Sequence, residues 1–138
     1  MGMRKHEILS GDKPAIKVLA STKVGLAIAA MQGMFAVAVP RPSDEETLLI
    51  RQRFDISAMD FPSLLAALLE QAVAGAEAEN AIFEDIKFSL ITDSKAMGEF
   101  IGKSVHGFAK PVKGVERAGL KIEKNEAGEW ETEIGFTV

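Results

Sequence analysis

The sequence predicts an α+β fold, a two-layer sandwich in which two helices pack on one face of a mixed, largely antiparallel β-sheet. Two stretches, residues 22–37 and 60–80, carry apolar residues at helical spacing. The stretches before, between and after them alternate between apolar and polar residues, as strands do, and are joined by short turns rich in Gly, Asp, Asn and Ser. With 138 residues and no cysteine, the chain is long enough to form one domain, residues 1–138, around its own core.

The first elements are two strands and a helix. Residues 6–20 predict a strand, a tight turn at 10–14 and a second strand. Thr22 is expected to cap a helix that runs to about Val37, and Gly33 within it would let a neighbouring element approach closely. One apolar stripe is expected on this helix, formed by Val24, Ala27, Ile28, Met31, Met34 and Phe35.

The middle of the chain predicts a surface loop, a strand and a second helix. Prolines and charged residues at 40–46 indicate the loop, and the alternation at 48–56 indicates the strand. Arg51, Arg53 and Asp55 should face water from that strand. The second helix should begin after the capping residue Asp60, and its buried face should consist of Leu64, Leu65, Leu68, Leu69, Ala72 and Val73.

The last part of the chain predicts three more strands, at residues 82–91, 112–123 and 129–138. A turn at 92–94 follows the first of them, and a turn at 124–128 joins the other two. In the final strand we expect the core-facing residues to be Trp130, Thr132, Ile134, Phe136 and Val138.

Composition argues against several classes of protein. The formal net charge is -4 and the pI is near 5.2, and no run of lysine or arginine is long enough to bind nucleic acid tightly by itself. No apolar run reaches the roughly 18–20 residues that span a bilayer, and the N-terminus lacks the apolar core of a signal peptide. We therefore expect a cytoplasmic protein that does not act at a membrane.

The standard catalytic motifs are missing. The sequence contains no phosphate-binding glycine loop, no His-Glu-x-x-His and no Gly-x-Ser-x-Gly, and it has two histidines and no tyrosine. Asp12 could ligate a hard cation such as Ca²⁺ or Mg²⁺, or it could simply stabilise the turn that contains it. His106 could take part in acid–base chemistry or bond the backbone of its own loop, and Lys113 could be a solvated side chain.

The stretch from 98 to 115 resembles the archease family. That family carries Gly-Glu-x-x-Asp-Pro-x-x-His, five residues, and then Val-Lys-Ala-Val. The positions that match without a gap are Gly98, Glu99, His106, Val112, Lys113 and Val115. The C-terminal end is similar to the family's Gly-x-Trp-x-x-x-Val-x-Leu-Asp-Val, and residues 29–37 and 60–88 resemble its two helices and a following Val-Phe-x-x-Phe strand.

The resemblance implies a non-enzymatic protein that helps an RNA ligase become guanylylated and turn over repeatedly in tRNA splicing or RNA repair. It implies that Asp12 contributes to a site for Ca²⁺ or another divalent cation. It further implies that Glu99, His106 and Lys113 contact the ligase. Thr137 stands where the family has a second metal-binding aspartate.

Two other functions are compatible with the same residues. The chain could be an archease-like scaffold that has lost the metal site, because of Thr137, and binds a protein or a small molecule instead. It could also be a metal-assisted hydrolase that uses Asp12 and Glu99. A carboxylate from Glu131 or Glu133, on the same strand face as Thr137, could replace the missing aspartate.

Overall fold

The computed structural model describes residues 2–42 and 47–138, so the end of the predicted loop at 43–46 lies outside the described residues. The elements in chain order are β1 (Arg4–Leu9), β2 (Ala15–Ala20), α1 (Lys23–Ala38), β3 (Leu49–Ser57), α2 (Phe61–Glu79), β4 (Ala81–Ile91), β5 (Lys95–Ser104), β6 (Gly114–Val115), β7 (Glu123–Lys124) and β8 (Trp130–Thr137). The α+β class is confirmed, and both helices begin at the predicted caps, Thr22 and Asp60.

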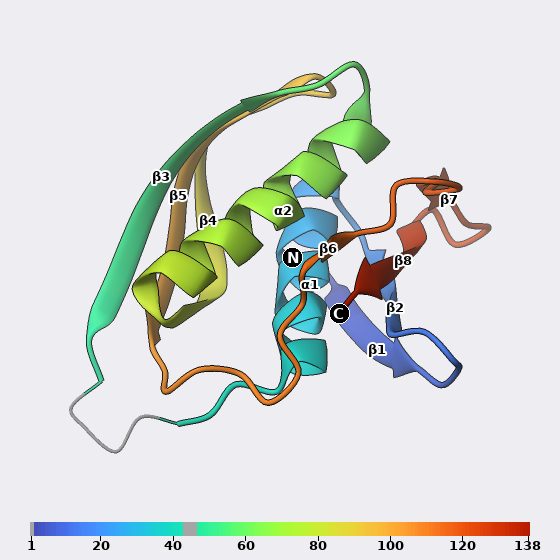
Figure 1. Ribbon diagram of the computed structural model, residues 1–138. Helices are drawn as coiled ribbons and strands as arrows, with labels where there is room; N and C mark the ends of the chain where they lie inside the picture. Colours follow the sequence, from blue (N-terminus) through green and yellow to red (C-terminus); the bar gives the residue numbers. More distant parts are fainter. Residues whose placement is uncertain (1, 43–46) are drawn as a thin grey trace.

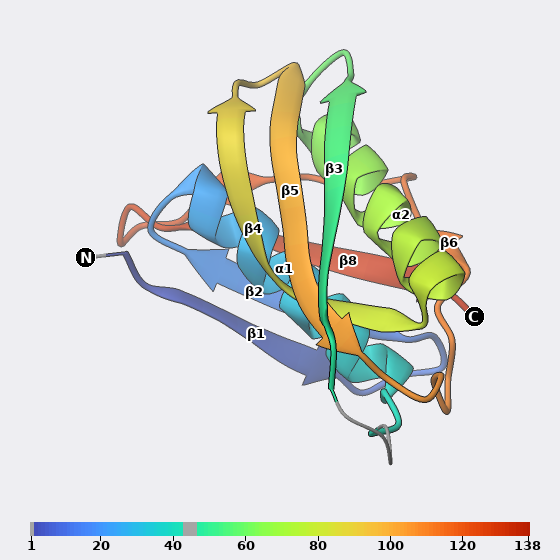
Figure 2. The same ribbon diagram turned by 90° about the vertical axis from the view of Figure 1, so that its left-hand side faces the viewer.

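The strands form two sheets rather than the single sheet that the sequence predicts. One sheet has the order β1-β2-β8-β6, with β7 also paired to β8, and the other has the order β3-β5-β4. Every ladder between the described strands is antiparallel. The two helices lie between the sheets (Figures 1 and 2), so each sheet has one face toward the helices and one toward solvent.

Helix α1 explains why two sheets are needed. It packs against β1 and β2 on one side and against β4 on the other. Instead of one stripe, it buries residues around most of its circumference, which are Gly25, Leu26, Ala27, Ile28, Ala29, Ala30, Met31, Gly33, Met34, Phe35, Val37 and Ala38. A helix that is apolar all round has to be covered on all sides. Val24, expected in the stripe, is 38% exposed at the solvent-facing start of the helix.

Helix α2 covers the three-stranded sheet. Asp60 caps it by accepting a hydrogen bond from the backbone N–H of Ser63 at 2.9 Å, and Asn80 ends it in the left-handed conformation at φ 49°. Its predicted apolar face is buried apart from Val73, which is half-buried. Below the helix, the ring of Phe100 stacks between those of Phe54 and Phe83, with centroid distances of 4.5 and 5.2 Å.

The predicted strand at 112–123 is wrong for most of its length. Only Gly114–Val115 and Glu123–Lys124 pair with β8, and the chain between them leaves the sheet. Gly119 has φ 76°, a left-handed turn conformation that a continuous strand does not contain. Val138, expected in the core, is 65% exposed because it lies beyond the last residue of β8.

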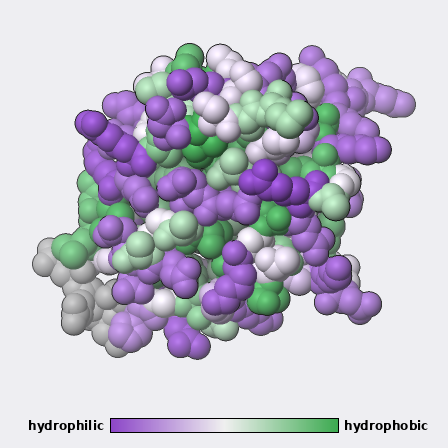
Figure 3. Space-filling view, turned by 45° about the horizontal axis from the view of Figure 1, so that its top comes forward, coloured by the Kyte–Doolittle hydropathy of each residue, from purple (hydrophilic) through white to green (hydrophobic). Residues whose placement is uncertain are grey.

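The surface is mixed in character. On the face seen in Figure 3, polar side chains divide the apolar surface into small patches. In the described part of the chain, neither helix combines the length and apolar character required to cross a membrane.

Candidate functional site

Asp12 and Lys113 lie far apart in the sequence but line the same depression, which has a volume of about 490 Å³. The turn between β1 and β2, the end of α1, the segment before β6 and the residue after β8 all contribute to it. Its lining residues are Gly11, Asp12, Pro14, Val37, Lys110, Pro111, Lys113 and Val138. This depression is the candidate functional site, because it unites the aspartate and one of the three partner-contacting residues that the sequence predicts.

Backbone hydrogen bonds to β8 fix both sides of the depression. The N–H of Phe136 donates to the carbonyl of Pro14 at 2.9 Å, which holds the turn that carries Asp12 against β8. The N–H of Lys113 donates to the carbonyl of Thr137 at 2.7 Å. The main chain beside both functional groups is therefore ordered by the sheet, while both side chains remain exposed to solvent.

The segment 106–113 brings a second lysine to the depression. The N–H groups of Ala109 and Lys110 donate to the carbonyls of Val39 and Ala38 at 2.9 and 3.0 Å, which fastens the segment to the end of α1. Val39 reverses the chain there with φ 51°. Sequence reasoning missed Lys110. The only signal for it is the sequence Lys-Pro-Val-Lys at 110–113, in which the proline disfavours helix and keeps the segment extended.

Thr137, which stands where the family has its second aspartate, does not line the depression. Its hydroxyl oxygen lies beside Gly114, 3.1 Å from the position that a Cβ there would take. Glu131 and Glu133 pair with Leu19 and Lys17 along β2. At about 3.3 Å per residue, they lie roughly 13–20 Å along the strand from Thr137. Neither glutamate supplies the second carboxylate.

The residues present do not fit a calcium site. Ca²⁺ takes six to eight oxygen ligands, several of them carboxylates. Among the described residues, Asp12 is the one carboxylate side chain that lines the depression, whereas Lys110 and Lys113 bring two ammonium groups to it. No group of three or more metal-ligating His, Cys, Asp or Glu side chains occurs in the described residues. The donor set is better suited to attracting an anion.

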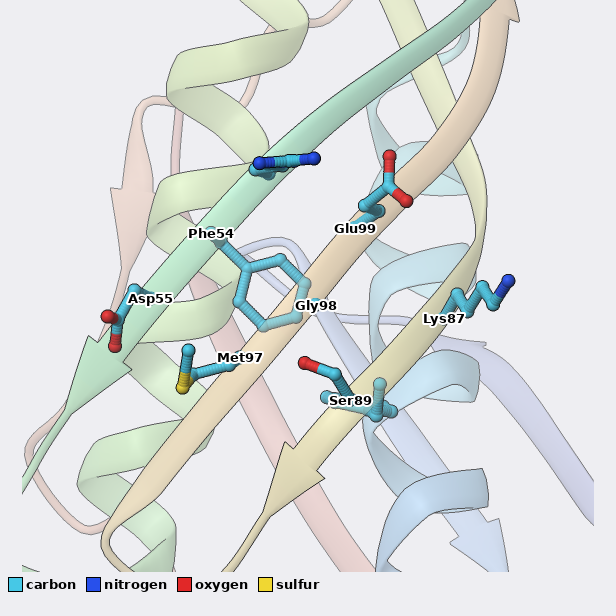
Figure 4. A pocket seen from close by; sticks show the side chains of 9 residues that line it. Phe54, Asp55, Lys87, Ser89, Met97, Gly98 and Glu99 are labelled. Carbon is cyan, nitrogen blue, oxygen red and sulfur yellow. The ribbon is translucent and has the colours of Figure 1, made fainter.

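Glu99 lies on the solvent-facing side of the three-stranded sheet, away from the Asp12 depression. It belongs to the central strand β5 and pairs with Arg53 of β3 on one side and Lys87 of β4 on the other. Figure 4 shows Glu99 and Lys87 on adjacent strands of this face. These three residues line a separate depression of about 610 Å³. The structure therefore does not bring Asp12 and Glu99 together, as a shared hydrolytic site requires.

His106 is exposed on a loop and does not line the Asp12 depression. Its backbone N–H donates to the carbonyl of Arg41 at 2.7 Å, and the N–H of Arg41 donates to the carbonyl of Gly107 at 2.9 Å. These bonds involve only the main chain, so both interpretations of the His106 side chain stay predictions. Of the predicted site residues, the fold thus unites Asp12 with Lys113 and leaves Glu99 and His106 elsewhere.

Comparisons with known proteins agree with this architecture. Residues 14–138 match the Archease protein family (MTH1598/TM1083). Two solved structures are similar in fold. One is Methanobacterium thermoautotrophicum protein 1598, with a TM-score of 0.66, 17% identity and coverage of 98% of each chain. The other is an archease from Thermotoga maritima described as a "possible chaperone", with a TM-score of 0.63, 9% identity and coverage of 96% of this chain and 98% of that one.

No curated protein matches the sequence significantly. The family match nevertheless covers nearly the whole chain, from Pro14, two residues after Asp12, through Val138. On this match, the chain belongs to the archease family.

Proposed function

We propose that this protein is a non-enzymatic cofactor that promotes guanylylation and multiple turnover of an RNA ligase during tRNA splicing or RNA repair in the cytoplasm. The observation that carries the proposal is the meeting of Asp12 and Lys113 in one depression, within a chain that belongs to the archease family. The net charge of -4 supports it, since an acidic protein is attracted to a ligase with a basic RNA-binding groove.

The test is guanylylation of the RNA ligase from the same organism with GTP and a divalent metal. We expect the wild-type protein to stimulate the reaction, and Asp12→Ala and Lys113→Ala each to reduce the stimulation. Lys121→Ala is the matched control, because Lys121 is an exposed lysine in a different depression, beside β8. If the folded wild-type protein does not stimulate a competent ligase, the proposal fails.

A second candidate function is a binding module that keeps the archease scaffold without its metal site. The two lysines beside Asp12 favour it, because they oppose cation binding. It predicts that Ca²⁺ causes no Asp12-dependent change in melting temperature. Specific binding at a hundredfold excess over Kd would stabilise the fold by about 2.7 kcal/mol, so a clear rise in the wild type that Asp12→Ala abolishes would reject this candidate.

A further inference from the structure

An apolar notch lies next to the Asp12 depression, between the C-terminal half of α1, the C-terminal half of α2 and the segment 108–113. It has a volume of about 50 Å³, and its lining residues are Met34, Phe35, Ala38, Val73, Ala76, Glu77, Phe108, Pro111, Val112 and Lys113. Pro111 and Lys113 line both the notch and the depression, so the two hollows share a rim.

The walls of the notch are fixed before any partner binds. Phe35 is 6% exposed, and its ring stacks on that of Phe108 with centroids 6.1 Å apart. Val112 and Ala76 are 7% and 2% exposed, so they are held by the core. A side chain that enters such a preformed hollow does not have to order its walls, which reduces the entropic cost of binding.

The charges around the notch are unequal on its two sides. Lys110 and Lys113 lie on the side of the Asp12 depression, and Glu77 lines the notch on the side of α2. In the described part of the chain, neither lysine ammonium has a carboxylate oxygen within 4.0 Å, whereas Lys13, Lys23, Lys95 and Lys103 each have one. Asp12 lines the same depression, so this side carries two ammonium groups and one carboxylate, and its excess positive charge favours a negative group from outside.

We propose that the notch and the two lysines form a docking site for a segment of a partner protein that carries a large apolar side chain next to an aspartate or glutamate. The end of the apolar side chain enters the notch, which is too small to enclose all of it, and the carboxylate pairs with Lys113 and Lys110. A free oxyanion would engage the lysines and leave the notch empty, and a nucleic acid would meet the opposing net charge of -4. This inference rests on the proposed function, since it names the surface through which the ligase is bound.

The site is tested first without the ligase, by nuclear magnetic resonance titration with three small probes. The probe N-acetyl-Leu-Asp-amide carries both groups, N-acetyl-Leu-Asn-amide lacks the charge and N-acetyl-Ala-Asp-amide lacks the large apolar group. We expect the first probe, at about 10 mM, to shift the amide signals of residues 73–77, 108–110, Val112 and Lys113. The two altered probes should bind at least about fivefold more weakly, as expected when one of two contacts worth about 1 kcal/mol is lost.

The protein variants provide the second half of the test. The double substitution Lys110→Gln with Lys113→Gln should weaken binding of the Leu-Asp probe until it binds no more tightly than the Leu-Asn probe does. The control Lys17→Gln with Lys121→Gln, which changes two exposed lysines of another depression, should leave the binding unchanged. The proposal is overturned if the Leu-Asp probe shifts none of these signals, if the neutral probe binds equally well, or if inorganic phosphate alone produces the same shifts.

The ligase assay then separates this inference from the proposed function. If the wild-type protein and the Lys110/Lys113 double variant stimulate the ligase equally, the docking site is wrong and so is the role given to Lys113, while the stimulation itself still supports the function. If the Leu-Asp probe binds as expected but the wild type does not stimulate a competent ligase, the function fails and the docking site stands.

Discussion

The substitution Gly98→Ala should strongly destabilise the protein, although it only adds a methyl group. An ideal Cβ at this position would lie 2.2 Å from the carbonyl oxygen of Lys87 and 3.0 Å from the Cα of Phe88, well inside the 3.4–4 Å of an ordinary contact. Both atoms belong to the backbone of β4, which bulges close to β5 between Phe88 and Leu90. Neither can move without disturbing the ladder.

The expected loss follows from two opposing effects. Alanine is favoured over glycine inside a strand by about 0.5–1 kcal/mol, whereas overpacking against a fixed backbone costs about 1–3 kcal/mol or more. Because β5 is the central strand, it cannot move away from β4 without also straining its ladder with β3. We therefore expect the free energy of unfolding to fall by about 2 kcal/mol.

Urea denaturation measures this loss, with Gly11→Ala as the matched control. Among the described residues, no heavy atom lies within 4 Å of an ideal Cβ at Gly11, and its φ is not in the left-handed range. The control should therefore be neutral or slightly stabilising. A Gly98→Ala protein as stable as the control would show that β4 and β5 are not this close.

Three further changes have defined expected results. Asp60→Ala should lower the melting temperature at neutral pH, because hydrogen bonds from the side chain and backbone of Ser63 lower the pKa of the Asp60 carboxyl below 3.8. This stabilisation is present above pH 3.8 and is lost as the pH falls through the lowered pKa. The melting temperatures of the wild type and the variant should therefore converge in a pH series below that pKa. Gln52→Met should raise the free energy of unfolding, measured by urea denaturation, by about 1 kcal/mol, since the buried Gln52 Oε1 has no hydrogen-bond partner among the described residues. A variant that is no more stable than the wild type would show that this oxygen does not destabilise the fold. Lys23→Met should cost about 1 kcal/mol and alter the fluorescence of Trp130, the single tryptophan, because the Lys23 ammonium lies 5.0 Å from the centre of its ring; an unchanged emission spectrum would contradict that contact.

The sequence predicts the elements that depend on local signals. Caps at Thr22 and Asp60 define where the helices begin, and alternation locates the strands that become β3 and β8. A single apolar stripe on residues 22–37 predicts a sheet on one side of the helix, whereas α1 is apolar around most of its surface and needs a sheet on each side. The strand at 112–123 was overpredicted because the alternation there takes no account of the turn at Gly119.

The candidate site was only partly predictable, because its parts come together through tertiary contacts. Asp12 and Lys113 could each be selected from the chain, but their meeting depends on β8 pairing with β2 on one side and β6 on the other. Lys110 and the apolar notch have no motif of their own. They arise where the segment 106–113 is fastened to the end of α1, and periodicity within a single element does not predict such contacts.

The structure also separates two kinds of residue within the stretch that resembles the family. Gly98 is required by the close approach of β4, and Val112 and Val115 are 7% and 8% exposed, so packing alone accounts for all three. Packing does not account for Lys113. Among the residues that the structure describes, only its backbone is bonded, through an N–H that any residue except proline would supply, and its side chain is exposed. If position 113 served only the stability of the fold, many residues would be tolerated there. The proposed ligase activation therefore depends on this lysine and on the depression that it shares with Asp12.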